Sequence, residues 1–323
     1  MKKLRAAVIG VGYLGNFHAQ KYAGLDSVDL VAVSDNDTAR CSEIAAQLGT
    51  AAVADYRALV GRVDLVSIVV PTVMHHEVAA FFLNHGVHVL LEKPITTTVA
   101  EARDLIGIAA RNKLVFQVGH LERFNPALDA VRGFIKKPGF IDATRVAPYK
   151  PRGTDVSIVL DLMVHDLDII STIVGSEVRA ISASGACVYS STPDIANARI
   201  EFENGAVANV TASRISLHSD RSIRFFQNDA YIAVDFQNRT ASVYRKGSAD
   251  SSAAIPVPLV EEIAVPQRDQ ILAEIEAFVD SVVTRTPPVV SGQDGTKALE
   301  LALLIEEKIA AKIALLQSGS EAE

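Results

Sequence analysis

The sequence predicts an α/β fold in two domains: a parallel sheet with helices on both faces, then an α/β domain with a large, mostly antiparallel open sheet. The chain has 323 residues, about twice the ~150 of an ordinary domain. Short apolar strands alternate with amphipathic helices up to residue 121, which is typical of βαβ units, and longer stretches with period-2 patterning follow. We therefore expect domains at residues 1–121 and 122–323.

The first domain is expected to contain strands and helices in strict alternation. Its strands are apolar on both faces, so helices must cover the sheet on both sides, and parallel strands with right-handed crossovers give that arrangement. The strands are expected at residues 6–9, 30–34, 63–69, 87–92 and 115–119, and the helices at 16–23, 38–48, 75–85 and 99–112.

The second domain is expected to be built mainly of antiparallel strands. Turn pairs such as Asn204-Gly205 and Asn228-Asp229 separate stretches of alternating apolar and polar residues, as in an antiparallel meander. One face of such a sheet needs a helical cover. Helices are expected at residues 126–136, 158–173 and 295–316, and strands at 141–146, 178–188, 197–202, 206–213, 222–227, 231–236 and 241–244.

The composition excludes several classes of protein. Hydrophobic residues make up 49% of the chain and charged residues 21%, which is typical of a globular protein and not of a disordered one. The net charge of −7 argues against a nucleic-acid partner. The apolar runs stop short of the ~20 residues of a membrane-spanning helix, and the two cysteines make no disulfide framework. We therefore expect a cytoplasmic protein with no nucleic-acid or membrane partner.

A glycine-rich turn follows the first expected strand and opens the first helix. The hexapeptide Gly-Val-Gly-Tyr-Leu-Gly at residues 10–15 has the spacing G-x-G-x-x-G. Gly10 would allow the tight turn, Gly12 the close approach of a pyrophosphate, and Gly15 the packing of the helix on the strand. The helix N-terminus would then face the anion. This pattern predicts a dinucleotide site.

An aspartate supports the same site. Asp35 follows the second expected strand and lies 20 residues after Gly15, the spacing of a carboxylate that accepts hydrogen bonds from the adenosine ribose. The carboxylate would repel a 2′-phosphate, so NAD is favoured over NADP. Arg40 is a nearby cation that keeps NADP open as the alternative.

Another apolar strand ends abruptly in Glu92-Lys93-Pro94. Ligands of open α/β sheets lie at the carboxyl ends of the strands. A lysine held there can hydrogen-bond a substrate hydroxyl and stabilise negative charge that develops on its oxygen. The alternative is a surface Glu–Lys pair of little energetic value, and the spacing alone leaves both interpretations open.

The densest polar cluster within an apolar pattern is on an expected helix of the second domain. Asp161, His165 and Asp168 are spaced i, i+4, i+7, so they would share one helical face. His165 is suited to act as a general base near neutral pH, and Asp161 could orient it from one turn back. A surface His–Asp pair and a metal site are the alternatives. Because no Cys/His cluster completes a ligand set, no metal is expected.

Together and in this order, the motifs resemble the glucose–fructose oxidoreductase / inositol dehydrogenase (Gfo/Idh/MocA) family over nearly the whole chain. The matching residues are the glycine turn, Pro71-x-x-x-His75, Glu92-Lys93-Pro94 and Asp161-x-x-x-His165. The resemblance implies a Rossmann domain followed by an α/β domain whose open sheet serves oligomerisation, so a homodimer or homotetramer is expected. It also implies reversible hydride transfer between a sugar or cyclitol carbinol and NAD(P).

The resemblance also implies roles for individual residues. Lys93 would polarise the reacting oxygen beside the nicotinamide, His165 would take the hydroxyl proton, and Asp161 would orient His165. His75 would lie near the cofactor phosphates or the nicotinamide. The cofactor-binding set implied in this way is Gly10, Gly12, Tyr13, Leu14, Gly15, Asp35, Pro71, His75, Glu92 and Lys93.

Residues 119–126, 148–153 and 157–163 resemble a narrower subgroup of the family, the UDP-N-acetylglucosamine 3-dehydrogenases. A nucleotide sugar brings a pyrophosphate, which attracts cations, so Arg123, Lys150 and Arg152 are expected substrate contacts. A solvated basic loop is the open alternative for these three residues. His120 and Asn125 are expected to contact sugar hydroxyls, or else to be a strand-end and a helix-start residue.

The resemblance therefore implies NAD-dependent oxidation of a secondary sugar hydroxyl, with C3 of UDP-N-acetylglucosamine as the expected position. Three alternatives stay open: an inositol or free-sugar dehydrogenase, a glycoside hydrolase assisted by tightly held NAD, and a non-catalytic NAD-sensing protein. The intact trio Lys93, Asp161 and His165 argues against the last, because a sensor has no chemical need for it.

Overall fold

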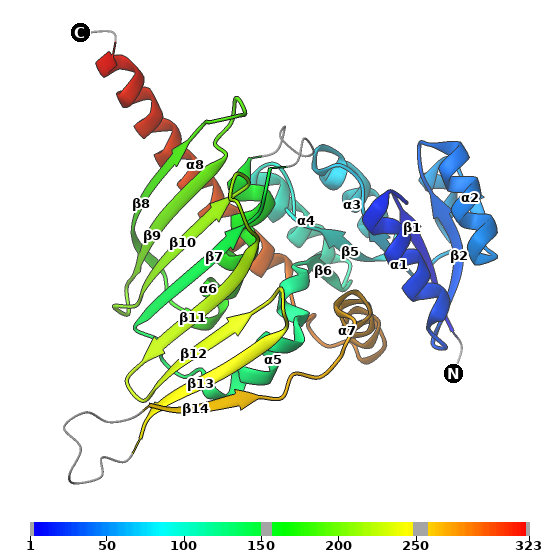
Figure 1. Cartoon of the computed structure of the whole chain (residues 1–323). Helices are drawn as coiled ribbons and strands as arrows, with labels where there is room; N and C mark the ends of the chain where they lie inside the picture. The colour runs from blue at the N-terminus through cyan, green and yellow to red at the C-terminus, as the bar shows by residue number, and fades with distance from the viewer. Residues whose placement is uncertain (1–2, 150–156, 248–257, 321–323) are drawn as a thin grey trace, which may run out of the picture. The chain divides into compact units, whose positions relative to one another are not determined.

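The structure, a computed structural model, describes residues 3–149, 157–247 and 258–320. The chain divides into two compact units, Met1–Leu121 with Arg268–Leu299 and Glu122–Gln267 with Glu300–Glu323 (Figure 1). The chain passes from the first unit to the second after Leu121. The segment Arg268–Leu299, however, returns to the first unit, which differs from the expected second domain of residues 122–323.

The first unit is built on a six-stranded sheet in the order β3-β2-β1-β4-β5-β6, and every pairing is parallel. The order reverses between β1 and β4, so the carboxyl ends of these two strands form the switch point at which such sheets bind ligands. The strands are β1 (Leu4–Ile9), β2 (Val28–Ser34), β3 (Ala51–Val53), β4 (Leu65–Ile68), β5 (His88–Glu92) and β6 (Phe116–Gly119). All but the short β3 were expected from the sequence.

Helices connect these strands, and their ends follow from local capping. The Asp37 side chain accepts the Arg40 backbone N–H at the start of α2, and Gly49 ends the helix in the left-handed conformation. Thr98 and Glu101 form a capping box at the start of α4. The helices are α1 (Tyr13–Gly24), α2 (Thr38–Leu48), α3 (His75–Asn84), α4 (Val99–Arg111) and α7 (Gln270–Thr284).

Helix α7 was not expected from the sequence. Its packing is the reason that the segment returns to the first unit. Ile275 and Phe278 on α7 are fully buried in one cluster with Ala19 and Tyr22 of α1. Burying side chains of this size stabilises the fold by about 1.5–3 kcal/mol each. Asp269, which caps α7, also forms an ion pair of 2.7 Å with Lys21 of α1.

The second unit is built on an eight-stranded sheet in the order β14-β13-β12-β11-β7-β10-β9-β8. The strands are β7 (Phe140–Val146), β8 (Val178–Ala186), β9 (Ile195–Phe202), β10 (Val207–Ser213), β11 (Asp220–Gln227), β12 (Ala230–Asp235), β13 (Thr240–Lys246) and β14 (Pro258–Ile263). The helices are α5 (Pro126–Val131), a π-helical turn (Val159–Met163) and α6 (Val164–Val174), and α8 (Gly292–Ser320) continues from the first unit.

The expected single meander is wrong in one respect. β7 lies between β10 and β11 and pairs in parallel with β10, so β8–β10 and β11–β14 form two separate antiparallel runs. Parallel pairing of β10 with a strand more than fifty residues earlier is a long-range contact, which local turn signals do not report. The mostly antiparallel open sheet is confirmed, and β14 is an additional strand.

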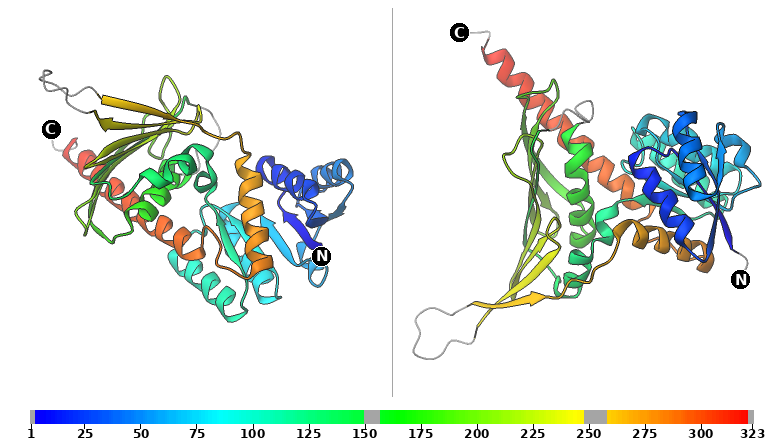
Figure 2. Two further views of the ribbon diagram at one scale, coloured as in Figure 1. Left: turned by 90° about the horizontal axis from the view of Figure 1, so that it is seen from below. Right: turned by 45° about the vertical axis from the view of Figure 1, so that its right-hand side comes forward.

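The described helices of the second unit lie on one face of its sheet (Figure 2). Side chains alternate accordingly: Ala208, Val210 and Ala212 of β10 are buried in the core shared with α6 and α8. A row of aromatic rings crosses the opposite face from strand to strand, with centroids 4.7–5.4 Å apart. The row comprises Phe140, Phe226, Tyr231 and Tyr244. Within the described parts of the chain, no helix is long and apolar enough to cross a membrane.

Candidate active site

The three glycines of the first turn differ in the space around their Cα atoms. A Cβ on Gly10, which has a φ of +85°, would lie 2.3 Å from the Val69 carbonyl oxygen. A Cβ on Gly15 would lie 1.9 Å from the carbonyl oxygen of Gly10, so no side chain fits there. A Cβ on Gly12, by contrast, would meet nothing within 4 Å. Gly12 is exposed at the N-terminus of α1, so the space over it is open to an anionic ligand.

This turn forms one wall of a pocket at the carboxyl ends of β1, β2 and β4. The opposite walls come from the segment after β2 and from the start of the 3-10 turn before α3. Tyr13 is exposed at the start of α1, and Leu14 is half-buried behind it. The lining includes Gly10, Gly12, Ser34, Asp35, Pro71 and Met74.

Backbone hydrogen bonds hold Asp35 at the edge of this pocket. Its Oδ2 accepts the Val11 N–H at 2.7 Å, and its Oδ1 accepts the Asp37 N–H at 2.9 Å. Each carboxylate oxygen keeps a further lone pair for a ligand hydroxyl. The guanidinium of Arg40 donates from Nε to the Val11 carbonyl oxygen at 2.7 Å, so it lies against the same turn.

His75 connects two backbone segments beside the pocket. It is 1% exposed, its Nδ1 lies 2.9 Å from the Pro94 carbonyl oxygen, and its Nε2 lies 2.9 Å from that of Val70. Burial lowers the pKa of the ring, although both carbonyls favour its charged form. Its contacts therefore hold the backbone around Pro71 and Pro94 in place.

Glu92 and Lys93 end β5, as the sequence indicated. The Lys93 backbone N–H donates to Glu92 Oε2 at 3.1 Å, and the peptide bond between Lys93 and Pro94 is cis. Glu92 is 8% exposed, whereas the Lys93 side chain is half-buried. A Cβ on Gly119 of the neighbouring strand β6 would lie 2.9 Å from Glu92 Oε1, so the glycine makes room for this carboxylate.

Asp161 and His165 lie in the second unit, and the expected regular helix is wrong at this point. Residues Val159–Met163 form a π-helical turn, in which the Val164 N–H donates to the Val159 carbonyl oxygen. A π turn inserts one extra residue, so α-helical spacing does not describe the relation between Asp161 and His165. Both side chains are half-buried, and His165 lies in the first turn of α6. Such turns are frequent at functional sites.

Arg123 and Asp168 form a buried bidentate ion pair. Arg123 Nε lies 2.6 Å from Asp168 Oδ2, and Nη2 lies 2.9 Å from Oδ1, with the two residues 7% and 2% exposed. This pairing balances the charge of Arg123, which the sequence analysis assigned to a substrate pyrophosphate.

A second buried network lies beside this pair. Arg145 on β7 forms two hydrogen bonds of 2.9 Å with Asp166 and one of 2.8 Å with Glu122. The Asn125 Nδ2 donates to Glu122 Oε2, and its Oδ1 caps α5 by accepting the Ala127 N–H. Asn125 is thus the helix-start residue of the alternative interpretation, and 1% of it is exposed.

The remaining expected residues are placed less specifically. His120, 1% exposed, directly follows β6 in the first unit. Lys150 and Arg152 lie outside the described residues.

The sequence analysis overlooked the partners Arg145, Asp166 and Glu122. The even-odd pattern of β7 was the available signal, because Arg145 has the same parity as the buried Ile141 and Ala143.

An open pocket at the switch point of a parallel sheet, a glycine turn with space for a pyrophosphate, and a carboxylate at the end of β2 define a Rossmann-type dinucleotide-binding protein. The comparisons with known proteins are more specific. A family model described as "Oxidoreductase family, NAD-binding Rossmann fold" matches residues 4–120, and the GFO/IDH/MocA C-terminal domain matches residues 133–233. The chain belongs to the Gfo/Idh/MocA family of oxidoreductases, as the motifs predicted.

Individual relatives match over nearly the full length. UDP-N-acetylglucosamine 3-dehydrogenase from Acidithiobacillus ferrooxidans is 39% identical over 313 residues, which are 96% of this chain and 99% of the relative. A solved structure of that enzyme has a TM-score of 0.90 at 38% identity and covers 96% of this chain and 99% of its own. Myo-inositol 2-dehydrogenase from Thermotoga maritima is 27% identical over 333 residues, or 96% of this chain and 98% of the relative.

Proposed function

We propose that the chain is an NAD-dependent dehydrogenase that oxidises the C3 hydroxyl of UDP-N-acetylglucosamine to the 3-keto sugar nucleotide. The observation that carries the proposal is the end-to-end similarity, at 39% identity, to an enzyme with this named activity. The open pocket over Gly12 supports it, because a dinucleotide needs a place for its pyrophosphate there. The reaction converts the carbinol and NAD⁺ into the ketone, NADH and a proton.

The residues at the ends of β5 and α6 supply the polar chemistry. NAD accepts the hydride when it is bound. The Lys93 ammonium hydrogen-bonds the reacting oxygen and stabilises its developing negative charge. His165 takes the hydroxyl proton as general base, and Asp161 orients the imidazole. Glu92 and His75 position Lys93 through the backbone, by the hydrogen bonds at Glu92 Oε2 and the Pro94 carbonyl.

NAD is proposed in preference to NADP on the basis of Asp35. Both of its oxygens accept backbone N–H groups, which hold the carboxylate at the edge of the pocket. A 2′-phosphate would meet that negative charge, whereas ribose hydroxyls can donate to it. Arg40 offers its Nε to the Val11 carbonyl, so part of its donor capacity is already used.

The substrate-binding residues need one revision. Because Asp168 balances the charge of Arg123, we assign Arg123 to the framework of the second unit and not to the pyrophosphate. Lys150 and Arg152 remain the proposed cations for the substrate, and His120 a proposed sugar contact. Asn125 is proposed to act mainly as the cap of α5.

We also propose a cytoplasmic location, because the two cysteines, Cys41 and Cys187, are free thiols.

The open sheet face with its aromatic row is the surface through which we propose that the chain forms a homodimer or homotetramer. Light scattering of the purified protein would measure the oligomeric state, and a monomer at all concentrations would contradict this part of the proposal.

The direct test is a substrate panel with NAD or NADP, followed by NADH or NADPH absorbance. The panel consists of UDP-N-acetylglucosamine, UDP-glucose, free N-acetylglucosamine and myo-inositol, with an amine reagent that traps the ketone. NADH formed only with UDP-N-acetylglucosamine is the expected result. Oxidation of myo-inositol instead would favour the second candidate function, inositol dehydrogenase, which the Thermotoga maritima relative supports. Turnover of none of them would contradict both.

Replacing Lys93 or His165 should separate chemistry from cofactor binding. Lys93→Met should lower kcat about 10²–10³-fold, and His165→Gln about 10²–10⁴-fold, because each removes a group that acts on the reacting oxygen or its proton. The Kd for NAD, measured by fluorescence titration, should change little. Lys113→Met and His218→Gln are matched controls at exposed positions. Nearly full activity in either Lys93→Met or His165→Gln would contradict the assigned roles.

Two glycine variants test where the cofactor lies. Gly12→Ala adds a methyl group in open space, so the Tm of the free protein should stay unchanged, while NAD affinity should fall at least about tenfold. Gly15→Ala brings a Cβ to 1.9 Å from the Gly10 carbonyl oxygen, so it should lower the Tm itself. If Gly12→Ala bound NAD as tightly as the wild type, the pyrophosphate would not lie over this turn.

A further inference from the structure

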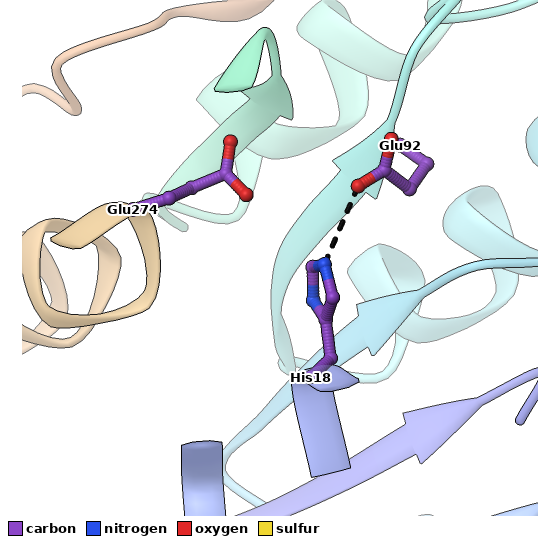
Figure 3. Close-up of side chains that lie close together, drawn as sticks. All are labelled: His18, Glu92 and Glu274. Atoms are coloured by element: carbon purple, nitrogen blue, oxygen red, sulfur yellow. Dashed lines mark ion pairs between the residues drawn. The ribbon is translucent and has the colours of Figure 1, made fainter. Parts of the chain in front are cut away.

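Three buried side chains from distant parts of the sequence converge inside the first unit. His18 on α1, Glu92 at the end of β5 and Glu274 on α7 point toward one another (Figure 3). Each offers one nitrogen or oxygen atom, and these atoms all lie within 4.8 Å of one another. The residues are 1%, 8% and 0% exposed. The dehydrogenase chemistry proposed above leaves His18 and Glu274 without a role.

Glu274 is the least explained member. Both of its carboxylate oxygens are buried and have no hydrogen-bond partner. Burial and the negative charge of Glu92 raise the pKa of the Glu274 carboxyl. An uncompensated buried carboxylate is strongly unfavourable, so such a group is retained where a proton or a cation neutralises it. A bound cation would replace the proton that otherwise neutralises Glu274.

His18 is oriented as metal-ligating histidines are. Its Nδ1 lies 3.3 Å from Ser67 Oγ, which in turn lies 2.9 Å from the Tyr22 hydroxyl. A partner on one ring nitrogen orients the ring and directs the other nitrogen to the ligand site. The directed atom is Nε2, and it lies 3.4 Å from Glu92 Oε1.

The separation of these two atoms fits ligands better than a strong hydrogen bond. Charge-assisted N–H···O bonds measure about 2.7–2.9 Å. Two ligands bound tetrahedrally at ~2.1 Å from one ion lie about 3.4 Å apart. The Glu274 carboxylate lies within 4.8 Å of both atoms, so binding of an ion would draw it closer. We propose that His18, Glu92 and Glu274 bind a divalent transition-metal ion, such as Zn²⁺ or Mn²⁺.

Two residues of the neighbouring strand β6 lie next to members of this proposed metal site. The missing side chain of Gly119 leaves the space that Glu92 Oε1 occupies, since a Cβ would lie 2.9 Å from it. Gln117, two residues earlier on the same face of the sheet, has a buried Oε1 without a partner, and its Nε2 donates to the Glu274 carbonyl. The Gln117 side chain is thus held against the backbone of Glu274, with its amide oxygen buried. Mixed imidazole and oxygen ligands are typical of Zn²⁺, Mn²⁺ and Fe²⁺ sites.

The ion has a structural function in this arrangement. It joins α1, which follows the glycine turn, to α7 and to the end of β5. The same Glu92 side chain accepts the Lys93 backbone N–H through its other oxygen. The ion thereby anchors the backbone that carries Lys93, while the Lys93 ammonium remains the group that acts on substrate.

The test measures metal content and thermal stability of the purified full-length protein. Metal analysis should find about one divalent ion per chain. Treatment with EDTA should lower the Tm, and added Zn²⁺ or Mn²⁺ should restore it. Co²⁺ bound to the stripped protein should give a visible absorption band of a low-symmetry site.

Glu274→Gln keeps the shape of the side chain and removes its charge, so affinity for the added ion should fall more than about 100-fold. Glu276→Gln, on the exposed side of the same helix, is the matched control and should behave like the wild type. A protein that purifies without metal and whose Tm is the same in EDTA, Zn²⁺ and Mn²⁺ would overturn the proposal. Equal ion binding by wild type and Glu274→Gln would overturn it as well, by placing the ion elsewhere.

Discussion

Both units bury carboxylates, and they compensate the negative charge in different ways. In the second unit, Asp168 meets the guanidinium of Arg123, and Asp166 meets that of Arg145, each through two hydrogen bonds. In the first unit, the buried Glu274 faces another carboxylate and has no hydrogen-bond partner.

This difference in charge compensation distinguishes carboxylates that stabilise the fold from carboxylates that can bind a ligand. When arginine hydrogen-bonds a buried carboxylate, it balances the negative charge, so no ligand is required to do so. A buried carboxylate without such a partner must be neutralised in another way, by a proton or by a bound cation. The same reasoning removes Arg123 from the proposed pyrophosphate contacts and adds Glu274 to a proposed metal site.

The largest effect in this comparison is expected at Arg123. Arg123→Leu leaves Asp168 buried and unpaired, which should lower the free energy of unfolding by about 3–5 kcal/mol. Urea unfolding followed by circular dichroism would measure the change. The exposed ion pair of Arg245 and Glu261 supplies the control, because Arg245→Leu should cost less than about 1 kcal/mol.

A double variant sharpens that result. If the loss arises from the stranded charge, then Asp168→Leu combined with Arg123→Leu should recover most of it, because an apolar pair needs no compensation. A double variant as unstable as Arg123→Leu alone would mean that packing, and not charge, accounts for the effect.

A smaller effect is expected at Asp194, whose carboxylate is compensated by the backbone. Burial alone would raise the pKa of this carboxyl, but the Ser190 side chain, together with hydrogen bonds from the backbone N–H groups of Val188, Tyr189 and Ser190 to Oδ2, lowers it to about 2. The folded pKa is below the unfolded value of ~3.9, so the stabilisation is complete above that value and is lost as the pH falls toward 2.

Asp194→Asn should therefore lower the free energy of unfolding by about 2–3 kcal/mol at pH 6. The difference from wild type should shrink between pH 4 and pH 3, which urea unfolding at a series of pH values would measure. A difference that stays constant over this range would show that the charge of Asp194 is not the cause.

The sequence predicted the first unit well because its signals are local. The bounds of α2 agree with the expectation to the residue, since Asp37 at its start and Gly49 at its end are visible in the sequence. The glycine turn and Asp35 were recognisable for the same reason, as each depends on spacing within one βαβ unit. α7 was not predicted, and its local pattern does not report the unit that it joins.

Long-range features were not predictable in this way. The pairing of β7 with β10, the partners of Arg145 and the convergence of His18, Glu92 and Glu274 each join segments that are remote in sequence. The π-helical turn at Val159–Met163 contains no glycine or proline, so no local sequence signal predicts it. Charge balance, which decided the interpretation of Arg123, is a property of neighbours in space.

The return of α7 to the first unit affects when that unit can finish folding during synthesis. The cofactor pocket is formed by residues near the N-terminus, but the helix that buries Ile275 and Phe278 against α1 ends at Thr284. During synthesis, the sheet of the first unit therefore emerges from the ribosome with the apolar surface of α1 uncovered, and nearly the whole chain must follow before it is closed. The nascent dinucleotide domain exposes that surface to chaperones throughout this time.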